Sequence, residues 1–243
     1  MTEIPFVEAA TISVVIPAFN AAPFLALALE SALAEMPALA PGKDFEILVV
    51  DDCSTDATPD IAAGYAGRGV RCLRRSIQGG IGAARNTGVA AAEGELLAFL
   101  DADDLWPPAR LAPLRAALDL AGPRSMAFGH IRQFACPSMN PDMRGRLRVP
   151  TEPIPGYCAS AMLLRRRDFL SVGAFSETLK VAEFIDWFGR ARDSGLVSRL
   201  IDQVVLERRI HGANQTIRHR ADYSDYALTL KRGLDRRRSG NAS

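Results

Sequence analysis

Three short apolar runs, each followed at once by a polar turn, constrain the fold of this 243-residue chain more than any other feature. The runs are Thr11–Ile16, Phe45–Val50 and Glu95–Leu100. The stretches between them are rich in Ala and Leu and are typical of helices: Ala21–Met36, Asp56–Ala66 and Gly82–Ala92. Strands that alternate with helices, and that are apolar along most of their length, predict an α/β fold. We expect a mostly parallel, Rossmann-like sheet flanked by helices on both faces.

The polar turns after these runs lie where open α/β sheets bind ligands, beyond the carboxyl ends of the strands. They are Pro17–Asn20, Asp51–Ser54 and Asp101–Asp104. Two of them are rich in carboxylates. We therefore expect one site at this edge of the sheet, for a cation or a hydroxyl-rich ligand.

Asp101-Ala102-Asp103-Asp104 is the strongest local feature. Carboxylates directly after a buried strand suit Mg²⁺ or Mn²⁺, which prefer oxygen ligands and share them with substrate phosphates. The alternative is that Asp104 caps a helix that begins near Pro107. A cap needs one Asp, whereas three carboxylates this close repel one another unless a cation offsets their charge. The segment therefore favours a metal site.

Two other segments of the first half suit a nucleotide. The carboxylates of Asp51–Asp56 can accept hydrogen bonds from a base or a ribose, although the segment would also serve as a plain turn and helix cap. Gln78–Asn86 joins a Gly-rich loop to a helix N-terminus, which attracts anions. Its Arg85 can contact a diphosphate through two hydrogen bonds, although a surface arginine is the alternative. The spacing fits neither a P-loop nor a dinucleotide fingerprint.

The second half is less regular. We expect the following strands and helices there: strands at Ser125–Phe134 and Gln203–Arg208, and helices at Arg165–Ser171 and Glu183–Ser194. Five prolines make Cys136–Pro155 a long irregular segment, and such segments in compact domains are commonly functional or disordered. His211 follows the last predicted strand and is a candidate metal or phosphate ligand, although a lone His is more often structural.

Composition excludes several other classes. The 29 basic and 28 acidic residues nearly cancel, which gives no support to nucleic-acid binding. The four cysteines lack metal-ligand spacing and disulfide density, which favours a reduced compartment. Residues 1–10 lack a signal-peptide pattern, and no apolar run approaches the length of a bilayer span. We therefore expect a cytoplasmic location, with at most peripheral contact at the inner face of a membrane.

Taken together, these segments resemble the family 2 glycosyltransferases of the GT-A fold. The resemblance covers residues 11–216 in order, and an ordered series is far more specific than a single motif. The matching segments are Val14–Asn20, Glu46–Asp56, Gly82–Gly88, Phe99–Asp104, Arg167–Phe175 and Arg209–Asn214.

The resemblance implies that the donor is a nucleotide-diphospho-sugar, for which we expect a UDP-sugar. Pro17, Phe19 and Asp52 would contact the nucleoside, and Asn20 belongs to the same group of nucleotide-binding residues. Arg85 would lie near the base and the diphosphate.

The resemblance also implies a metal-dependent, inverting reaction. Asp101 would contact the ribose or the metal, Asp103 would ligate Mn²⁺ or Mg²⁺, and His211 would face the diphosphate or the metal from the far side. One carboxylate would act as general base on the acceptor hydroxyl. The acceptor would be a glycan, a lipid-linked sugar, a peptide or a small molecule. We expect Cys136–Pro155 to line the acceptor side, because the first hundred residues already account for the nucleotide.

The chain departs from the family at this base. The family usually has Glu-Asp at the start of the helix under the active site, whereas here Phe184 follows Glu183. Glu183 and Asp186 remain as candidate catalytic carboxylates. We favour Glu183, because Asp186 stands four residues before Arg190 and can form a structural salt bridge with it. A smaller departure is Cys53, where Gly is more common.

Two rival functions stay open. A nucleotidyltransferase also places an acidic metal site on such a sheet, but Pro17–Asn20 is not the basic Gly-rich loop it would need. A catalytically weak or inactive nucleotide-sugar-binding protein is the second rival, and Phe184 favours it.

The expected organisation is a single domain with short additions at both ends. Residues 1–10 form an N-terminal extension, and residues 11–216 form the GT-A domain, with a nucleotide-binding half (11–104) and an acceptor half (105–216). Residues 217–243 form a C-terminal helix and a basic tail, in which we expect Arg236–Arg238 to be solvated.

Overall fold

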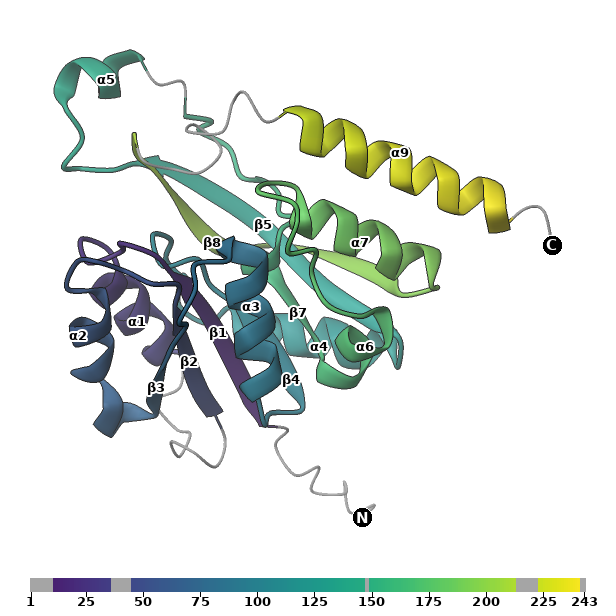
Figure 1. Cartoon of the computed structure of the whole chain (residues 1–243), viewed down its shortest axis with the longest axis horizontal. Helices are drawn as coiled ribbons and strands as arrows, with labels where there is room; N and C mark the ends of the chain where they lie inside the picture. Colours follow the sequence, from purple (N-terminus) through teal and green to yellow (C-terminus); the bar gives the residue numbers. More distant parts are fainter. Residues whose placement is uncertain (1–10, 36–44, 147–148, 213–222, 241–243) are drawn as a thin grey trace.

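The computed structural model describes residues 11–35, 45–146, 149–212 and 223–240. One eight-stranded sheet runs through these residues in the order β3-β2-β1-β4-β7-β5-β6, with β8 paired to β5 (Figure 1). The strands are β1 (Ile12–Ala18), β2 (Phe45–Asp51), β3 (Val70–Arg74), β4 (Leu96–Phe99), β5 (Ser125–Ala135), β6 (Ile154–Pro155), β7 (Met162–Arg165) and β8 (Val197–Ile210). The predicted α/β class is confirmed.

The first half of the sheet is parallel. β1 pairs in parallel with both β2 and β4, and β2 pairs in parallel with β3. Every residue of β1 and β2 is buried, as expected for strands that are covered on both faces. The three predicted strands are confirmed, and β3 is an edge strand that the sequence analysis missed.

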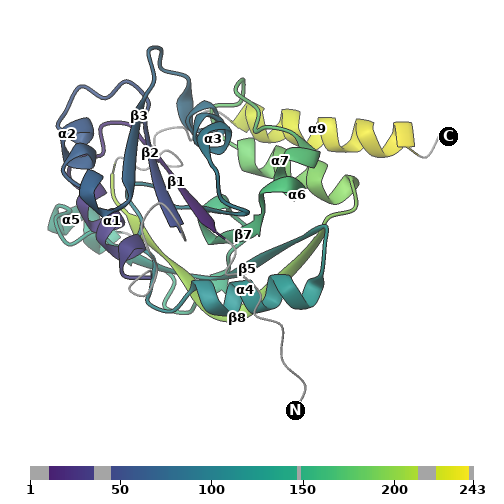
Figure 2. The ribbon, with the colours of Figure 1, turned by 90° about the horizontal axis from the view of Figure 1, so that it is seen from below.

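Helices cover both faces of this sheet. The helices and 3₁₀ turns are α1 (Leu25–Leu33), α2 (Thr58–Ala63), η1 (Ala66–Arg68), α3 (Gly80–Ala91), α4 (Leu111–Ala121), α5 (Pro141–Arg146), η2 (Ala159–Ala161), α6 (Arg166–Val172), α7 (Glu183–Asp193) and α9 (Tyr223–Gly240). Val14 and Ile16 pack with α1 and α4, whereas Val15, between them, packs in the core that contains residues of α3, α6 and α7. Figure 2 shows the sheet between these two layers.

The second half of the sheet is mostly antiparallel. β7 runs antiparallel to β4 and β5, and β8 runs parallel to β5 over most of its length. The Ser125–Phe134 and Gln203–Arg208 strands and the two helices of this half are confirmed, with β8 longer than predicted. The described residues contain no helix long and apolar enough to span a bilayer.

Three local expectations were wrong. Cys136–Pro155 is not irregular throughout, because it contains α5 and β6. The helix expected near Pro107 begins at Leu111. Arg236 does not lie in a solvated tail: it is part of α9, which packs along α7, and its Nε donates to Asp193 Oδ2 at 2.8 Å (Figure 1). Residues 1–10 and 217–222 lie outside the described residues, and the domain limits stay predictions.

Candidate active site

The loops after β1, β2 and β4 meet at one edge of the sheet, as the sequence predicted. The loops after β1 and β2 are joined by hydrogen bonds. The backbone N–H of Asn20 donates to Ser54 Oγ at 2.9 Å, and Asn20 Oδ1 accepts from the Thr55 N–H at 2.8 Å. Asn20 can make this turn because it tolerates the left-handed backbone conformation found here, with φ +49°.

The two predicted nucleoside contacts at the end of β1 differ in accessibility. Pro17 is buried within the strand, opposite Val50. Phe19, two residues later, has 45% of its surface exposed. A partly exposed ring beside polar loops is suited to stacking on a base.

Asp52 is buried and holds the Gly-rich loop. Its carboxylate accepts hydrogen bonds from the backbone N–H groups of Gly79 (3.0 Å) and Gly80 (2.7 Å), and it forms an ion pair with Arg75 at 2.9 Å. Asp52 thereby fixes the loop that leads into α3. The sequence analysis missed Arg75, whose partner is 23 positions away in the chain and whose local context is an ordinary edge strand.

The backbone at Cys53 has a conformation that favours Gly. Its φ is +67°, in the left-handed region that favours glycine. Cys53 Sγ donates to the backbone carbonyl of Arg75 at 3.2 Å, which gives the side chain a partner in this turn.

Arg85 lies at the centre of the site between two carboxylates. The buried guanidinium donates from Nη2 to Asp101 Oδ1 at 2.7 Å and from Nη1 to Glu183 Oε1 at 2.5 Å. Burial disfavours its charge, but Asp101 and Glu183 outweigh this and raise the pKa of Arg85. The ion pairs connect the end of β4 to the start of α7, residues that lie far apart in the sequence.

Asp103 and His211 meet on the other side of the same loop. Asp103 Oδ2 lies 2.9 Å from His211 Nε2, and the Phe24 ring lies 4.6 Å from the imidazole ring between centroids. The backbone of Asp103 is held as well, because Arg209 Nε donates to its carbonyl at 2.9 Å. The chain thus brings together two residues that are 108 positions apart.

Asp104 does not cap a helix. It is buried and accepts a hydrogen bond from the Arg209 N–H at 2.9 Å. Burial, followed by the charges of Asp103 and Asp101, raises the pKa of Asp104 well above its usual value. Repulsion among these carboxylates, expected from the sequence, is therefore present in the fold.

The site residues that the structure describes could hold a metal together with substrate phosphates, but they do not form a metal site from protein ligands alone. Among the described residues, no three His, Cys, Asp or Glu side chains form a metal-binding group by themselves. Mg²⁺ and related ions are commonly held by one or two carboxylates together with substrate phosphates. Asp103, with His211 beside it and Asp101 two residues earlier, fits that kind of site.

The start of α7 explains the Phe at the usual Asp position. Phe184 is buried among aromatic rings, 5.8 Å from Phe188 and 6.4 Å from Trp187 between centroids. Glu183, one residue earlier, faces Arg85. The predicted salt bridge between Asp186 and Arg190 is confirmed, with Arg190 Nε 3.0 Å from Asp186 Oδ2.

Ser160 is a second site residue that the sequence analysis missed. Its hydroxyl accepts a hydrogen bond from the Asp101 N–H at 3.1 Å, so η2 supports the loop that follows β4. The signal in the sequence is weak, because Ser160 lies 59 positions from Asp101 in a small-residue stretch that fits no motif.

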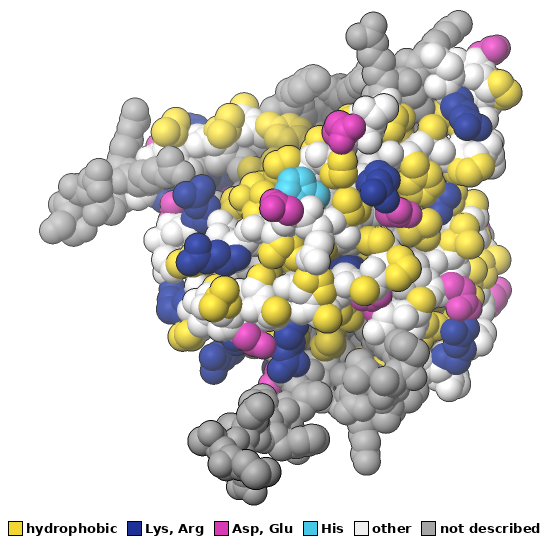
Figure 3. All heavy atoms as spheres, turned by 180° about the vertical axis from the view of Figure 1, so that it is seen from behind, with side chains coloured by type: hydrophobic (Ala, Val, Ile, Leu, Met, Phe, Trp, Pro, Cys, Tyr) yellow, Lys and Arg dark blue, Asp and Glu magenta, His cyan; other side chains and the backbone are white. Residues whose placement is uncertain are grey.

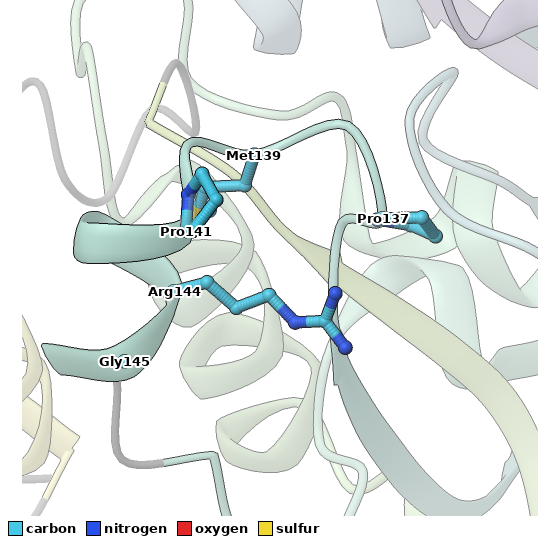
Figure 4. Close-up of a pocket in the computed structure, with 5 residues that line it drawn as sticks. All are labelled: Pro137, Met139, Pro141, Arg144 and Gly145. Atoms are coloured by element: carbon cyan, nitrogen blue, oxygen red, sulfur yellow. The ribbon is translucent and has the colours of Figure 1, made fainter.

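The segment after β5 forms a hollow of about 470 Å³ lined by Pro137, Met139, Pro141, Arg144 and Gly145 (Figure 4). It adjoins the end of β8, because the Cys136 N–H donates to the Ile210 carbonyl at 2.8 Å. His211 follows directly. The prediction that this segment lines the acceptor side stays a prediction.

Comparisons with known proteins agree with this geometry. The sequence profile described as Glycosyl transferase family 2 matches residues 13–172, which is more than half of the chain. The succinoglycan biosynthesis protein ExoO of Rhizobium meliloti (strain 1021) is 40% identical over 163 residues, 63% of this chain and 43% of ExoO. ExoU of the same organism is 31% identical over 229 residues, 85% of this chain and 65% of ExoU. The chain therefore spans only part of the length of these relatives.

A solved structure shows the same fold. Residues 1–349 of TarS from S. aureus superpose with a TM-score of 0.69 at 22% identity, over 93% of this chain and 65% of that one. TarS has also been solved in complex with UDP. The chain has the GT-A fold and belongs to glycosyl transferase family 2.

Proposed function

We propose that this glycosyltransferase moves a sugar from a UDP-sugar to an acceptor hydroxyl, with inversion and with Mn²⁺ or Mg²⁺ bound. The observation that carries the proposal is the Asp103–His211 pair, 2.9 Å apart, beside the Asp101–Arg85–Glu183 network. These groups place carboxylates, a cation and an imidazole at one edge of the sheet.

The donor is assigned to the loops after β1 and β2. Phe19 would supply an accessible ring for the base. Asn20 holds the turn after β1, Asp52 holds the Gly-rich loop, and Pro17 is the penultimate residue of β1, the strand that leads to Phe19. UDP is chosen because TarS, which shares the fold, has been solved with UDP, and because the E. coli relative WfaP, 33% identical over 101 residues, is described as a UDP-Glc glucosyltransferase.

A divalent cation would be held by Asp103, with Asp101 and His211 as further ligands. When bound, it would neutralise the diphosphate as the leaving group departs. Arg85 would keep Asp101 oriented.

The transfer itself forms one bond and breaks one. The acceptor oxygen attacks the anomeric carbon, the bond from that carbon to the diphosphate oxygen breaks, and UDP leaves with the electron pair. The acceptor proton passes to a carboxylate, for which we propose Glu183. Its Oε1 is engaged by Arg85, and no described residue hydrogen-bonds its Oε2.

The alternative is a protein that binds the nucleotide sugar without efficient transfer. The observation that favours it is Phe184, a buried ring at the position where the family usually has the base. The surface charge does not distinguish the two functions. Basic and acidic side chains are interspersed over the described part of the face in Figure 3.

Two measurements test the proposal. The first is calorimetric titration of UDP in Mn²⁺ and in chelator, where we expect clearly tighter binding with the metal because carboxylates and diphosphate repel one another until a cation bridges them. Equal UDP affinity in Mn²⁺ and in chelator would exclude a metal requirement for UDP binding.

The second is product formation from labelled UDP-sugars with a panel of glycan, lipid-linked, peptide and small-molecule acceptors. Transfer supports the enzyme. Tight UDP binding without any transfer across the panel would support the inactive binding protein.

A further inference from the structure

An accessible aromatic ring lies on the acceptor half beside the candidate active site. Tyr157, between β6 and η2, has 46% of its surface exposed. Its ring packs on two others, 5.3 Å from Phe128 and 5.6 Å from Phe188 between centroids. Phe128 is fully buried, so the Tyr157 ring is supported from inside the protein. No described residue hydrogen-bonds its hydroxyl.

Two contacts place this ring near the groups of the transfer reaction. Ser160, three residues after Tyr157, accepts the hydrogen bond from the Asp101 N–H at 3.1 Å. Phe188, which packs against Tyr157, lies on α7, the helix that begins at Glu183. Tyr157 therefore adjoins two elements that carry site residues, the segment of Ser160 and helix α7.

Electrostatics agree with this position. Cys158, the next residue, is influenced by the same carboxylate loop: burial, followed by the charge of Asp101, raises the pKa of its thiol to about 11. The charge of Asp101 therefore acts on the segment that carries Tyr157.

The chemistry of the ring suits a sugar. An aromatic face attracts the C–H groups of a pyranose ring, and a phenol hydroxyl can hydrogen-bond a sugar hydroxyl at its rim. Ligand sites commonly combine such a ring with a few polar groups that fix orientation. A single supported ring with a polar end fits one sugar residue and offers no long apolar groove.

Resting on the proposed transferase function, we propose that Tyr157 is a stacking platform for the acceptor, and that the acceptor therefore presents a pyranose ring at this site. Among the acceptor classes named above, this selects a glycan, a glycoside or a lipid-linked sugar over a peptide.

Saturation-transfer NMR with Mg²⁺ and UDP present tests this directly. The probes are the methyl β-glycosides of glucose, galactose, mannose and N-acetylglucosamine, with glucitol as an acyclic polyol that lacks the ring face. The variants are Tyr157→Ala, Tyr157→Phe and Tyr157→Leu. Leu120→Ala on α4, at a residue that is 92% exposed and far along the chain from the site, is the control.

We expect at least one glycoside, and not glucitol, to receive saturation from the wild-type protein. Its affinity should fall about tenfold in Tyr157→Ala, the loss expected when one aromatic stacking contact is removed. Tyr157→Phe and Leu120→Ala should keep it. Tyr157→Leu covers the underlying rings without an aromatic face, so it separates stacking from core packing if the Ala variant is unstable.

Two outcomes would overturn the platform: no glycoside exceeding glucitol, or equal glycoside affinity in Tyr157→Leu and the wild type. UDP signals in the same spectra separate the two proposals. If UDP binds but no glycoside binds in a way that depends on Tyr157, only the platform proposal is rejected. If UDP does not bind, the proposal of a UDP-sugar transferase is rejected.

Discussion

Two residues of the predicted nucleotide-binding half are held by hydrogen bonds to the backbone of a neighbouring loop, whereas two aromatic residues of the predicted acceptor half are held by ring packing. Asn20 and Asp52 each bond backbone N–H groups of a neighbouring loop. Phe184 and Tyr157 instead contact other aromatic rings. The hydrogen bonds of Asn20 and Asp52 join loops that are 35 and 28 positions apart in the chain. Loss of a buried ring removes packing, whereas loss of an exposed ring does not, so aromatic residues of the two regions should respond differently to substitution.

The largest expected effect concerns the proposed base. Glu183→Gln should lower turnover by roughly 10²–10⁴-fold, the contribution of a positioned general base, while metal-dependent UDP binding stays nearly intact. Turnover at saturating donor and acceptor is the measurement.

Asp186→Asn is the matched control for this helix. Asp186 pairs with Arg190 and lies 3.8 Å from Arg236, so its loss should lower the thermal midpoint more than the turnover. If Asp186→Asn abolishes turnover in a folded protein and Glu183→Gln does not, the base is misassigned. If neither does, the reaction uses no base on α7.

A pair of identical substitutions tests the contrast between the halves. Phe184→Ala should lower the free energy of unfolding by about 3–5 kcal/mol, because it removes a buried ring. Phe19→Ala, at a partly exposed ring, should change it by about 0.5 kcal/mol or less and should weaken UDP binding instead. Denaturant unfolding measures the stability of the two variants, and UDP titration measures their affinity. Equal destabilisation by Phe184→Ala and Phe19→Ala would contradict the expected difference between the two rings.

The next largest expected effect concerns the metal. Asp103→Ala should reduce the Mn²⁺-dependent gain in UDP affinity by roughly 10–100-fold, at least the loss seen when a metal's supporting residues are removed. UDP affinity in chelator should not fall, because the substitution removes a carboxylate that repels the diphosphate. A variant that retains the full gain would show that Asp103 is not a ligand.

The smallest expected effect concerns Cys53. Cys53→Gly should raise the free energy of unfolding by roughly 0.5–1 kcal/mol, because relief of a left-handed backbone (about 1–2 kcal/mol) exceeds the added chain entropy of glycine (roughly 0.5–1 kcal/mol). Cys53→Val should lower it. UDP affinity should not change in either; a stabilised Val variant would show that the backbone is not strained here.

The contrast also explains how far sequence alone could reach. The strands and turns of the first half were predicted because apolar runs and polar turns follow one another directly, as in Val14–Asn20 and Phe99–Asp104. β3 and β7 were missed, because a short edge strand and a four-residue strand running into a helix carry little periodicity.

The sequence predicted which site residues lie together only where those residues belong to recognisable motifs. Asp103 and His211 were expected to share a ligand, and the structure places them together. The roles of Arg75, Ser160 and the rings around Phe184 depend on partners fixed by tertiary packing. No local pattern distinguishes these residues from ordinary core and edge positions.

The position of Arg85 has a consequence for the order of events. One guanidinium contacts Asp101, a proposed metal ligand, and Glu183, the proposed base. If Asp101 helped to hold a metal and diphosphate, the charge that Arg85 shares with Glu183 would change. Donor and acceptor binding would then be thermodynamically coupled, and the coupling would be reciprocal: the factor by which UDP changes acceptor affinity would equal the factor by which the acceptor changes UDP affinity.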